Sequence, residues 1–193
     1  MTTELAHLRS DARDNRDRIV EAARALFAER GLDVGMREIA RRAEVGPATL
    51  YRRFATRDDL VDEAFSIELE TCRRIVVEGC ADDDAWRGLS STLTALVELN
   101  AGNRGFVDAF TATAAASGSA HSVIAAHRRE LLGMLAGLVA RARAAGRLRA
   151  DFTVDDVVLI LRAGRGAAAG GSVAAARRFV ELTLDGLRSR GAD

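Results

Sequence analysis

The sequence has little proline, few aromatic residues and no excess of either charge. It contains one proline, Pro47, in 193 residues, and aromatic residues make up 5% of the chain. Arginine supplies all 28 basic residues, and 28 acidic residues balance them to a formal net charge of zero. A uniformly basic nucleic-acid-binding surface is therefore excluded, whereas a local basic patch is not. Abundant alanine and leucine beside so little proline favour helix along most of the chain.

Cysteines are also few, and long apolar runs are missing. Cys72 and Cys80 fall in one predicted helix, where about 12 Å along the axis separates them. They cannot form a disulfide with each other, and a reduced, cytoplasmic chain is the simplest interpretation. The sequence has no apolar run of about 18 residues, and its first residues lack the apolar core of a signal peptide. Neither a membrane span nor export is therefore expected.

Apolar spacing predicts three helices in the first part of the chain. Residues 1–10 show no clear pattern, and the first helix is expected from about Asn15 to a C-cap at Gly31. A short amphipathic helix over 36–43 follows it. The second and third helices are then joined by only about four residues, which is the layout of a helix-turn-helix.

The single proline marks the start of the third helix. Gly46 is the expected N-cap and Pro47 the first helical residue, where the missing N–H of proline leaves no donor unpaired. Leu50 and Phe54 are four residues apart and are expected to face inward. The helix is expected to end at about Phe54, with its polar side chains on the outer surface.

The rest of the chain is predicted to be helical as well. A long helix over about 57–79 is expected, opened by a capping box of Thr56 and Asp59. Further helices are predicted over 84–100, 104–116, 120–145, 153–165 and 172–190. The sequence thus predicts an all-α protein with an N-terminal three-helix unit, residues 10–56, and a larger C-terminal helical domain, residues 57–193. The helix over 57–79 is expected to connect the two.

The short third helix has the side chains needed for DNA. A helix with one buried stripe and a dense polar face fits the major groove, and arginine can bind guanine through two hydrogen bonds. Between residues 37 and 57, six arginines minus two glutamates give a local charge of plus four in a neutral protein. Focused positive charge favours phosphate contact. Double-stranded DNA is therefore the expected partner.

The order of residues across this region is more specific than a helix-turn-helix alone. Residues 19–65 read IVEAARALFAERGLDVGMREIARRAEVGPATLYRRFATRDDLVDEAF, with an LYRRF core and Arg57 three positions after it. This block resembles the DNA-binding domain of the TetR family of bacterial transcriptional regulators. The resemblance implies a homodimer on a partly palindromic operator. It also implies a C-terminal domain that binds a small-molecule effector, dimerises through its last two helices and relieves repression when ligand binds.

The resemblance also assigns roles to residues of the motif. Arg37 is expected to reach a phosphate from the second helix, while Tyr51 and Arg57 mainly hold phosphates. The other implied contacts, to bases or backbone, are Pro47, Ala48, Thr49, Arg52 and Arg53.

Four positions depart from the family pattern. Gly35 and Met36 stand where the family usually has Thr or Ser before the second helix. Glu44 and Gly46 stand where the turn usually has Gly and Ser. A glycine N-cap costs only about a few tenths of a kcal/mol, so the fold is expected to survive. Glu44 places a negative charge near DNA. These departures support an alternative, a helical small-molecule-binding or adaptor protein that no longer uses its DNA-binding motif.

The C-terminal domain offers candidates for an effector pocket and a dimer interface, although most of them can equally be ordinary core. Arg162 lies among apolar neighbours and can anchor an acidic ligand or pair with an aspartate across a dimer interface. The candidate pocket residues are Trp86, Leu89, Leu93, Phe106, Phe110, His127, Leu131, Met134 and Arg162. The candidate interface residues, from the last two helices, are Val157, Ile160, Leu161, Phe179, Leu182 and Leu187.

No sequence motif points to catalysis. The chain has no G-x-S-x-G, no P-loop and no paired His/Cys ligand set. His121 and His127 are six residues apart and so face different sides of a helix. We therefore expect no enzymatic activity, no cofactor and no metal site.

Overall fold

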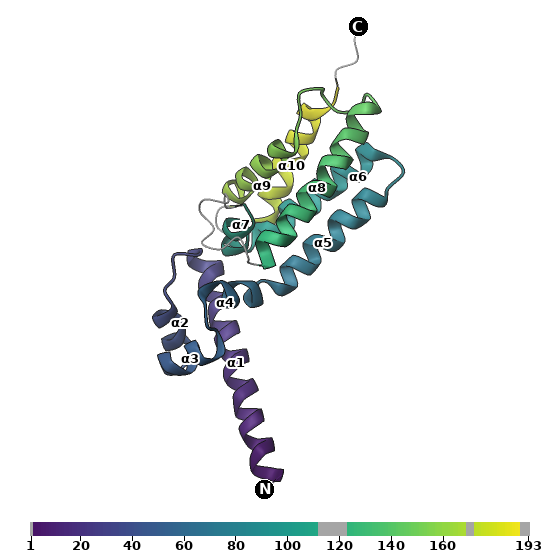
Figure 1. The fold of residues 1–193 in the computed structure, drawn as a ribbon. Helices are drawn as coiled ribbons and strands as arrows, with labels where there is room; N and C mark the ends of the chain where they lie inside the picture. Colours follow the sequence, from purple (N-terminus) through teal and green to yellow (C-terminus); the bar gives the residue numbers. More distant parts are fainter. Residues whose placement is uncertain (1, 112–122, 169–171, 190–193) are drawn as a thin grey trace.

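The computed structural model describes residues 2–111, 123–168 and 172–189, with side chains from residue 13 onward. These residues form ten helices and no strand, which confirms the all-α prediction. The helices are α1 Thr2–Arg30, α2 Met36–Arg42, α3 Pro47–Arg53, α4 Arg57–Ala64, α5 Ser66–Ala81, α6 Ala85–Ala101, α7 Arg104–Thr111, α8 Val123–Ala144, α9 Val154–Ala167 and α10 Val173–Leu187. Helices α1 to α4 form a small unit at one end of the bundle made by α5, α6, α8, α9 and α10 (Figure 1). No helix within the described ranges is both long and apolar enough to cross a membrane.

Helix α1 begins earlier than its apolar pattern predicts. It starts at Thr2, so the start predicted at about Asn15 is wrong. The segment carries Leu, Ala, Glu and Arg, which form helix readily without an apolar stripe. Periodicity detects only the part of a helix that packs against something, and therefore places the start too late.

The connecting helix expected over 57–79 is two helices rather than one. Helix α4 ends and α5 begins around Phe65, whose backbone angles, φ −107° and ψ 12°, depart from helical values. The Phe65 ring is fully buried and lies 5.7 Å from both the Phe27 and the Phe106 ring centres. Packing of this ring accompanies the change of direction, whereas the apolar spacing continues on both sides and gives no sign of it.

Local capping interactions define the starts of several helices. Thr56 and Asp59 form the expected capping box at α4. The Thr56 nitrogen lies 2.9 Å from Asp59 Oδ2, and the Asp59 nitrogen lies 3.1 Å from Thr56 Oγ1. Gly46 is the N-cap of α3 and Pro47 its first residue, as predicted. Asp84 caps α6 by accepting a hydrogen bond from the backbone N–H of Arg87 at 3.0 Å. These local bonds fix where the helices begin.

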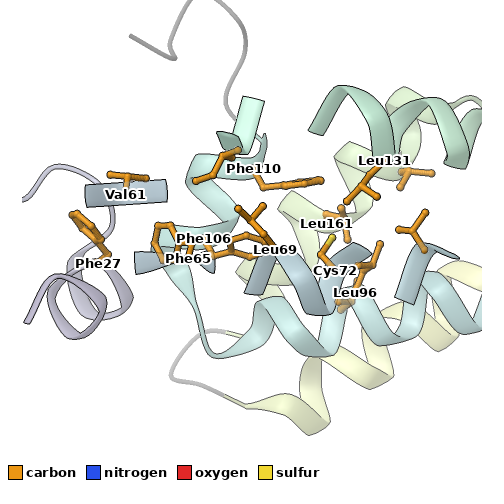
Figure 2. Packing of buried hydrophobic residues seen from close by; sticks show 14 of the residues in the cluster. Phe27, Val61, Phe65, Leu69, Cys72, Leu96, Phe106, Phe110, Leu131 and Leu161 are labelled. Carbon is orange, nitrogen blue, oxygen red and sulfur yellow. The ribbon is translucent and has the colours of Figure 1, made fainter. Parts of the chain in front are cut away.

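A row of aromatic rings runs from α1 into the bundle. Phe27, Phe65, Phe106 and Phe110 are all buried, and successive ring centres lie 5.7, 5.7 and 5.8 Å apart (Figure 2). Tilted ring pairs at this spacing contribute about 0.5–1.5 kcal/mol each beyond the area they bury. The first three helices therefore share one core with the C-terminal domain.

Helices α5 and α6 cross at two glycines. A Cβ on Gly79 would lie 1.8 Å from Thr92 Oγ1 and 2.9 Å from the Gly88 carbonyl oxygen. A Cβ on Gly88 would lie 2.3 Å from the Gly79 carbonyl oxygen. The two backbones therefore approach at a distance that only glycine permits.

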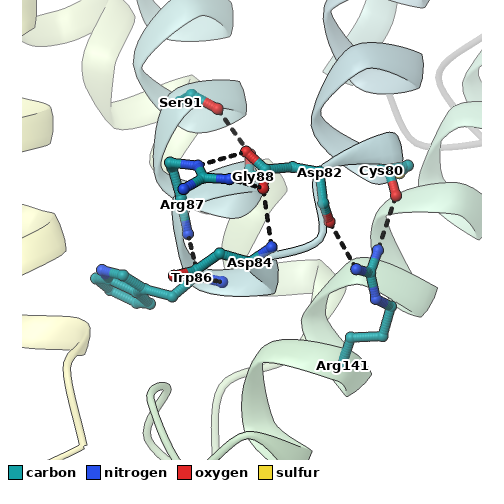
Figure 3. Close-up of polar contacts among 8 residues, drawn as sticks. All are labelled: Cys80, Asp82, Asp84, Trp86, Arg87, Gly88, Ser91 and Arg141. Atoms are coloured by element: carbon teal, nitrogen blue, oxygen red, sulfur yellow. Dashed lines mark hydrogen bonds and ion pairs between the residues drawn. The ribbon is translucent and has the colours of Figure 1, made fainter.

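Polar contacts hold the turn between α5 and α6 (Figure 3). Arg141 of α8 donates to the carbonyl oxygens of Cys80 and Asp82, at 2.7 and 2.6 Å. Arg87 donates two hydrogen bonds to the Asp82 carboxylate, at 2.8 and 2.7 Å, and these bonds lower the pKa of Asp82. The end of α5 is thus satisfied by a side chain from a third helix.

Both cysteines carry free thiols. Cys72 is buried, and desolvation raises its pKa to about 12, so its reactive thiolate form is suppressed. Cys80 is partly buried, and burial raises its pKa as well, although Arg141 opposes that effect. The environment of Cys72 is that of an inert core residue.

The close crossing generates a stability prediction. Gly79→Ala should lower the free energy of unfolding by about 1–3 kcal/mol, because the added methyl must displace Thr92 and backbone. Gly137→Ala is the matched control, since nothing lies within 4 Å of a Cβ at this exposed position in α8. The control should gain up to about 1 kcal/mol from helix propensity. Urea denaturation at one protein concentration measures both, and equal midpoints would contradict the proposed steric constraint.

Candidate nucleic-acid interface

Helix α3 has one buried and one exposed face. Leu50 and Phe54 are 0% and 1% exposed, as their spacing predicts. Tyr51 is 51% exposed, and the outer surface also carries Pro47, Ala48 and Arg52. The helix therefore presents hydroxyl and guanidinium groups to solvent while its apolar stripe anchors it.

Three further residues implied in DNA contact are only partly exposed. Thr49, Arg53 and Arg57 are half-buried. Arg53 Nε and Arg57 Nη1 are buried and have no hydrogen-bond partner in the described part of the chain. The Arg57 guanidinium lies 5.6 Å from the centre of the Phe27 ring, within cation–π range. These two arginines therefore bridge the protein interior and the outer surface.

Helix α2 contributes exposed charge beside α3. Arg37 is exposed. Glu38 forms ion pairs with Arg30 and, at 3.7 Å, with Arg41. The negative charge of Glu38, one of the two glutamates counted between residues 37 and 57, is therefore neutralised by neighbouring guanidinium groups. The surface next to α3 therefore keeps its basic character.

The turn between α2 and α3 contains a strained residue. Glu44 has φ 55°, the one positive φ among the described non-glycine residues. The Val45 N–H bonds the Ala40 carbonyl oxygen at 3.0 Å, so the chain reverses out of α2 through a left-handed residue. This conformation costs a residue with a Cβ about 1–2 kcal/mol. The departure from glycine noted in the sequence therefore has a direct conformational consequence.

Arg16 supports α3 and was not singled out in the sequence. Its guanidinium lies 4.7 Å from the centre of the Phe54 ring, and its Nη2 is 3.1 Å from Glu63 Oε2. Arg16 thus joins α1 to the end of α3 and to α4. No local pattern could have revealed it, because its partners are 38 and 47 positions away along the chain.

The N-terminal unit also makes polar contacts with the bundle. Glu68 Oε1 of α5 accepts hydrogen bonds from Arg24 Nη2 at 2.8 Å and from Asn103 Nδ2 at 3.1 Å. At Gly105 of α7, an added Cβ would lie 2.7 Å from the Phe27 carbonyl oxygen. Helices α1, α5 and α7 are therefore closely joined beside the row of aromatic rings.

The candidate effector residues lie in different environments. Five of them, Leu89, Leu93, Phe106, Phe110 and Leu131, are buried in the common core.

The other four candidates lie elsewhere. Trp86 is buried under the Arg188 guanidinium, 5.5 Å from the ring centre, while Met134 is half-buried. His127 lines a cleft beside α3. Arg162 is exposed on α9, which removes the reason to expect it to anchor a buried acidic ligand.

Most of the candidate interface residues are also core. The prediction that Val157, Ile160, Leu161 and Leu187 face a partner is wrong, because all four are buried within the chain itself. Phe179 is half-buried, and only Leu182 is well exposed, at 56%. Helices α9 and α10 use these stripes to pack on α6 and on each other. An apolar stripe in a sequence does not show which partner covers it.

In residues 2–111, 123–168 and 172–189, no group of three or more His, Cys, Asp or Glu side chains could hold a metal ion. His121 and residues 112–116 of the predicted helix 104–116 lie outside those ranges.

The strained turn generates a prediction that separates strain from charge. Glu44→Gly should raise the free energy of unfolding by about 0.5–1 kcal/mol, because glycine adopts positive φ without steric cost. Glu44→Ala removes the same charge but keeps the Cβ, and should not gain this stability. Both variants should bind DNA more tightly than the wild type, as measured by fluorescence anisotropy at low salt. Equal stability of the two variants in urea would contradict the strain argument.

Comparisons with known proteins cover both parts of the chain. A family model for bacterial regulatory proteins of the tetR family matches residues 19–64. A model for the C-terminal domain of SbtR-like transcriptional regulators matches residues 84–189. An HTH-type transcriptional regulator of Staphylococcus aureus (strain USA300) is 44% identical over 54 residues, 28% of this chain and 29% of that protein. The chain thus matches less than a third of the length of this curated relative.

Solved structures extend the likeness to nearly the whole chain. A TetR transcriptional regulator from Streptomyces coelicolor is 32% identical, with 91% of this chain and 99% of that chain covered and a TM-score of 0.52. The TetR family protein CprB from the same species is 20% identical over 92% of this chain and 90% of its own, with a TM-score of 0.63, and shares the fold. With both of its parts matched, the chain belongs to the TetR family of bacterial transcriptional regulators, and α2 and α3 are its DNA-binding helix-turn-helix.

Proposed function

We propose that this protein is a ligand-responsive repressor that binds a partly palindromic operator as a homodimer. The observation that carries the proposal is the outer face of α3, where Tyr51 and Arg52 are exposed over a fully buried Leu50 and Phe54. A helix anchored in this way can enter the major groove without exposing apolar surface. As a bacterial DNA-binding regulator, the protein would act in the cytoplasm.

The residues of the interface divide into base-reading and phosphate-binding groups. Arg52 is the exposed guanidinium best placed to bind a guanine edge, with Arg53 beside it on the same helix. The N-terminal turn of α3, with Pro47, Ala48 and Thr49, can approach bases or backbone closely because its side chains are small. The proposed phosphate contacts are Arg37, Tyr51 and Arg57.

We further propose that the exposed face of α9 and α10 forms the dimer interface. Leu159 and Leu182 are 63% and 56% exposed, which is unusual for large apolar side chains. Gly166 and Gly186 lie on the same two helices, and nothing lies within 4 Å of a Cβ at either position. Small residues beside exposed leucines allow a second pair of helices to approach closely, as in a four-helix interface.

The proposed response to effector is a shift between two populations. A dimer on B-DNA needs its two recognition helices about 34–36 Å apart. A small molecule bound by the C-terminal domain alters operator affinity only if it binds more tightly to the dimer at one helix spacing than at another. The shared aromatic core makes such coupling possible because movement of Phe106 in α7 reaches Phe27 through the Phe65 ring.

The DNA-binding proposal is tested by selecting bound fragments from randomised DNA. The wild type should enrich a partly palindromic site, and Arg52→Ala should weaken binding to it by about 10- to 100-fold through loss of a base contact. Arg74→Ala is the control, because Arg74 is an exposed arginine on α5, outside the helix-turn-helix. Binding by the wild type should also fall steeply as salt rises. A folded, dimeric wild type that enriches no site at low salt would contradict the proposal.

The dimer proposal is tested by charge insertion at an exposed leucine. Leu182→Asp should produce a folded monomer in sedimentation velocity, because an unpaired carboxylate cannot be buried against a second copy. Ile67→Asp is the matched control, since Ile67 on α5 is 62% exposed and lies outside the proposed interface. A dimer that survives Leu182→Asp but dissociates with Ile67→Asp would move the interface to α5.

A further inference from the structure

A carboxylate on α4 caps a helix of the regulatory domain. Asp62 Oδ2 accepts a hydrogen bond from the Val123 N–H at 2.7 Å, and Asp62 Oδ1 accepts one from the Ile124 N–H at 3.1 Å. Val123 and Ile124 are the first two residues of α8. Their N–H groups have no partner within α8, because the first turn of a helix leaves its donors unpaired.

The geometry makes this contact stronger than an ordinary surface hydrogen bond. Each carboxylate oxygen accepts from one of these two N–H groups, and a negative charge at a helix N-terminus is also favoured by the helix dipole. Helix caps usually come from the residue just before the helix. Here the cap comes from Asp62, 61 positions upstream, so the bond joins two separate parts of the fold.

The position of α4 in the fold allows the Asp62 contact to affect α3. Leu60, Val61 and Ala64 are buried, which fixes α4 within the DNA-binding end of the molecule. Only residues 54–56 separate it from the recognition helix α3, and the break at Phe65 separates it from α5. A change in the direction of α4 therefore reaches α3 without requiring α5 to move as one rigid rod.

We propose that Asp62 is the positioning residue that links the orientation of the recognition helix to the place of the α8 N-terminus. In this role the Asp62 carboxylate holds α4 against α8, and a displacement of α8 within the bundle moves α4 and, with it, α3. The inference rests on the proposed DNA-binding function and adds the contact through which the regulatory domain reaches it. By linkage, operator binding must in turn alter the strength of the Asp62 contact.

The cleft around Asp62 supplies a matched control. The cleft, of about 700 Å³, is lined by residues of α1, α3, α4, α5 and α8, including Arg53, Asp62, Glu70 and His127. Glu70 is an exposed carboxylate of α5 on this cleft, and no bond from it to α8 occurs among the described contacts. Glu70→Gln therefore removes the same charge from the same cleft while leaving the α8 cap in place.

The test measures hydrogen exchange of single amides by NMR in the full-length protein, free and bound to the operator found by selection. In the free proteins, Asp62→Ala should speed exchange of the Val123 and Ile124 amides by about tenfold relative to wild type and Glu70→Gln. Asp62→Asn keeps one acceptor oxygen and should give an intermediate effect. Circular dichroism and the exchange of amides in α5 and α6 report whether each variant is folded.

Operator binding then provides the decisive comparison. In wild type and Glu70→Gln, bound operator should change exchange of the two α8 amides by at least about threefold, whereas in Asp62→Ala it should leave them unchanged. An operator that binds without changing these amides in wild type, or that changes them equally in Asp62→Ala, overturns the coupling while the DNA-binding function stands. If no operator is enriched, the DNA-binding proposal and the coupling both fail. Equal exchange in free wild type and Asp62→Ala would show that the contact itself does not form.

Discussion

The structure depends on the row of four phenylalanines that passes from the DNA-binding helices into the regulatory bundle. Phe27 belongs to α1, Phe65 stands between α4 and α5, and Phe106 and Phe110 belong to α7. Their ring centres are 5.7 to 5.8 Å apart, and all four rings are buried. Because these rings share one core, the helix-turn-helix cannot change its position without disturbing side chains of the bundle.

Two further features connect the DNA-binding helices to the bundle at this shared core. Gly105 allows α7 to touch the backbone of α1, since a Cβ there would lie 2.7 Å from the Phe27 carbonyl oxygen. Burial of Phe65 accompanies the division of the connecting segment into α4 and α5. A short α4 has fewer contacts to break than a continuous helix, so it can respond to α8 through Asp62 while α5 stays with the bundle. Tight packing at one point and a helix break at the next are consistent with the proposed coupling between α8 and α3.

The start of α3 and its buried face follow from the sequence, whereas the turn before α3 contains a residue with a strained backbone. Pro47 and Gly46 start α3 where the sequence predicts, and Leu50 and Phe54 fix which face looks outward. Glu44 occupies a left-handed turn position for which glycine is better suited. This backbone conformation costs a residue with a Cβ about 1–2 kcal/mol, yet the turn still closes with the Val45 N–H to Ala40 carbonyl hydrogen bond.

The sequence by itself determined the all-α fold, the position of α3, its buried stripe and the family, because capping and helical periodicity act over a few residues. Only the tertiary structure decided which apolar stripes are core. Val157 and Leu161 read as interface residues but are buried, whereas Leu159 on the same helix is exposed. It also decided the break at Phe65 and the contacts of Arg16 and Asp62, whose partners lie far along the chain. The physical reason is that a local pattern fixes which face of a helix is apolar, whereas the element that covers this face depends on how distant segments pack.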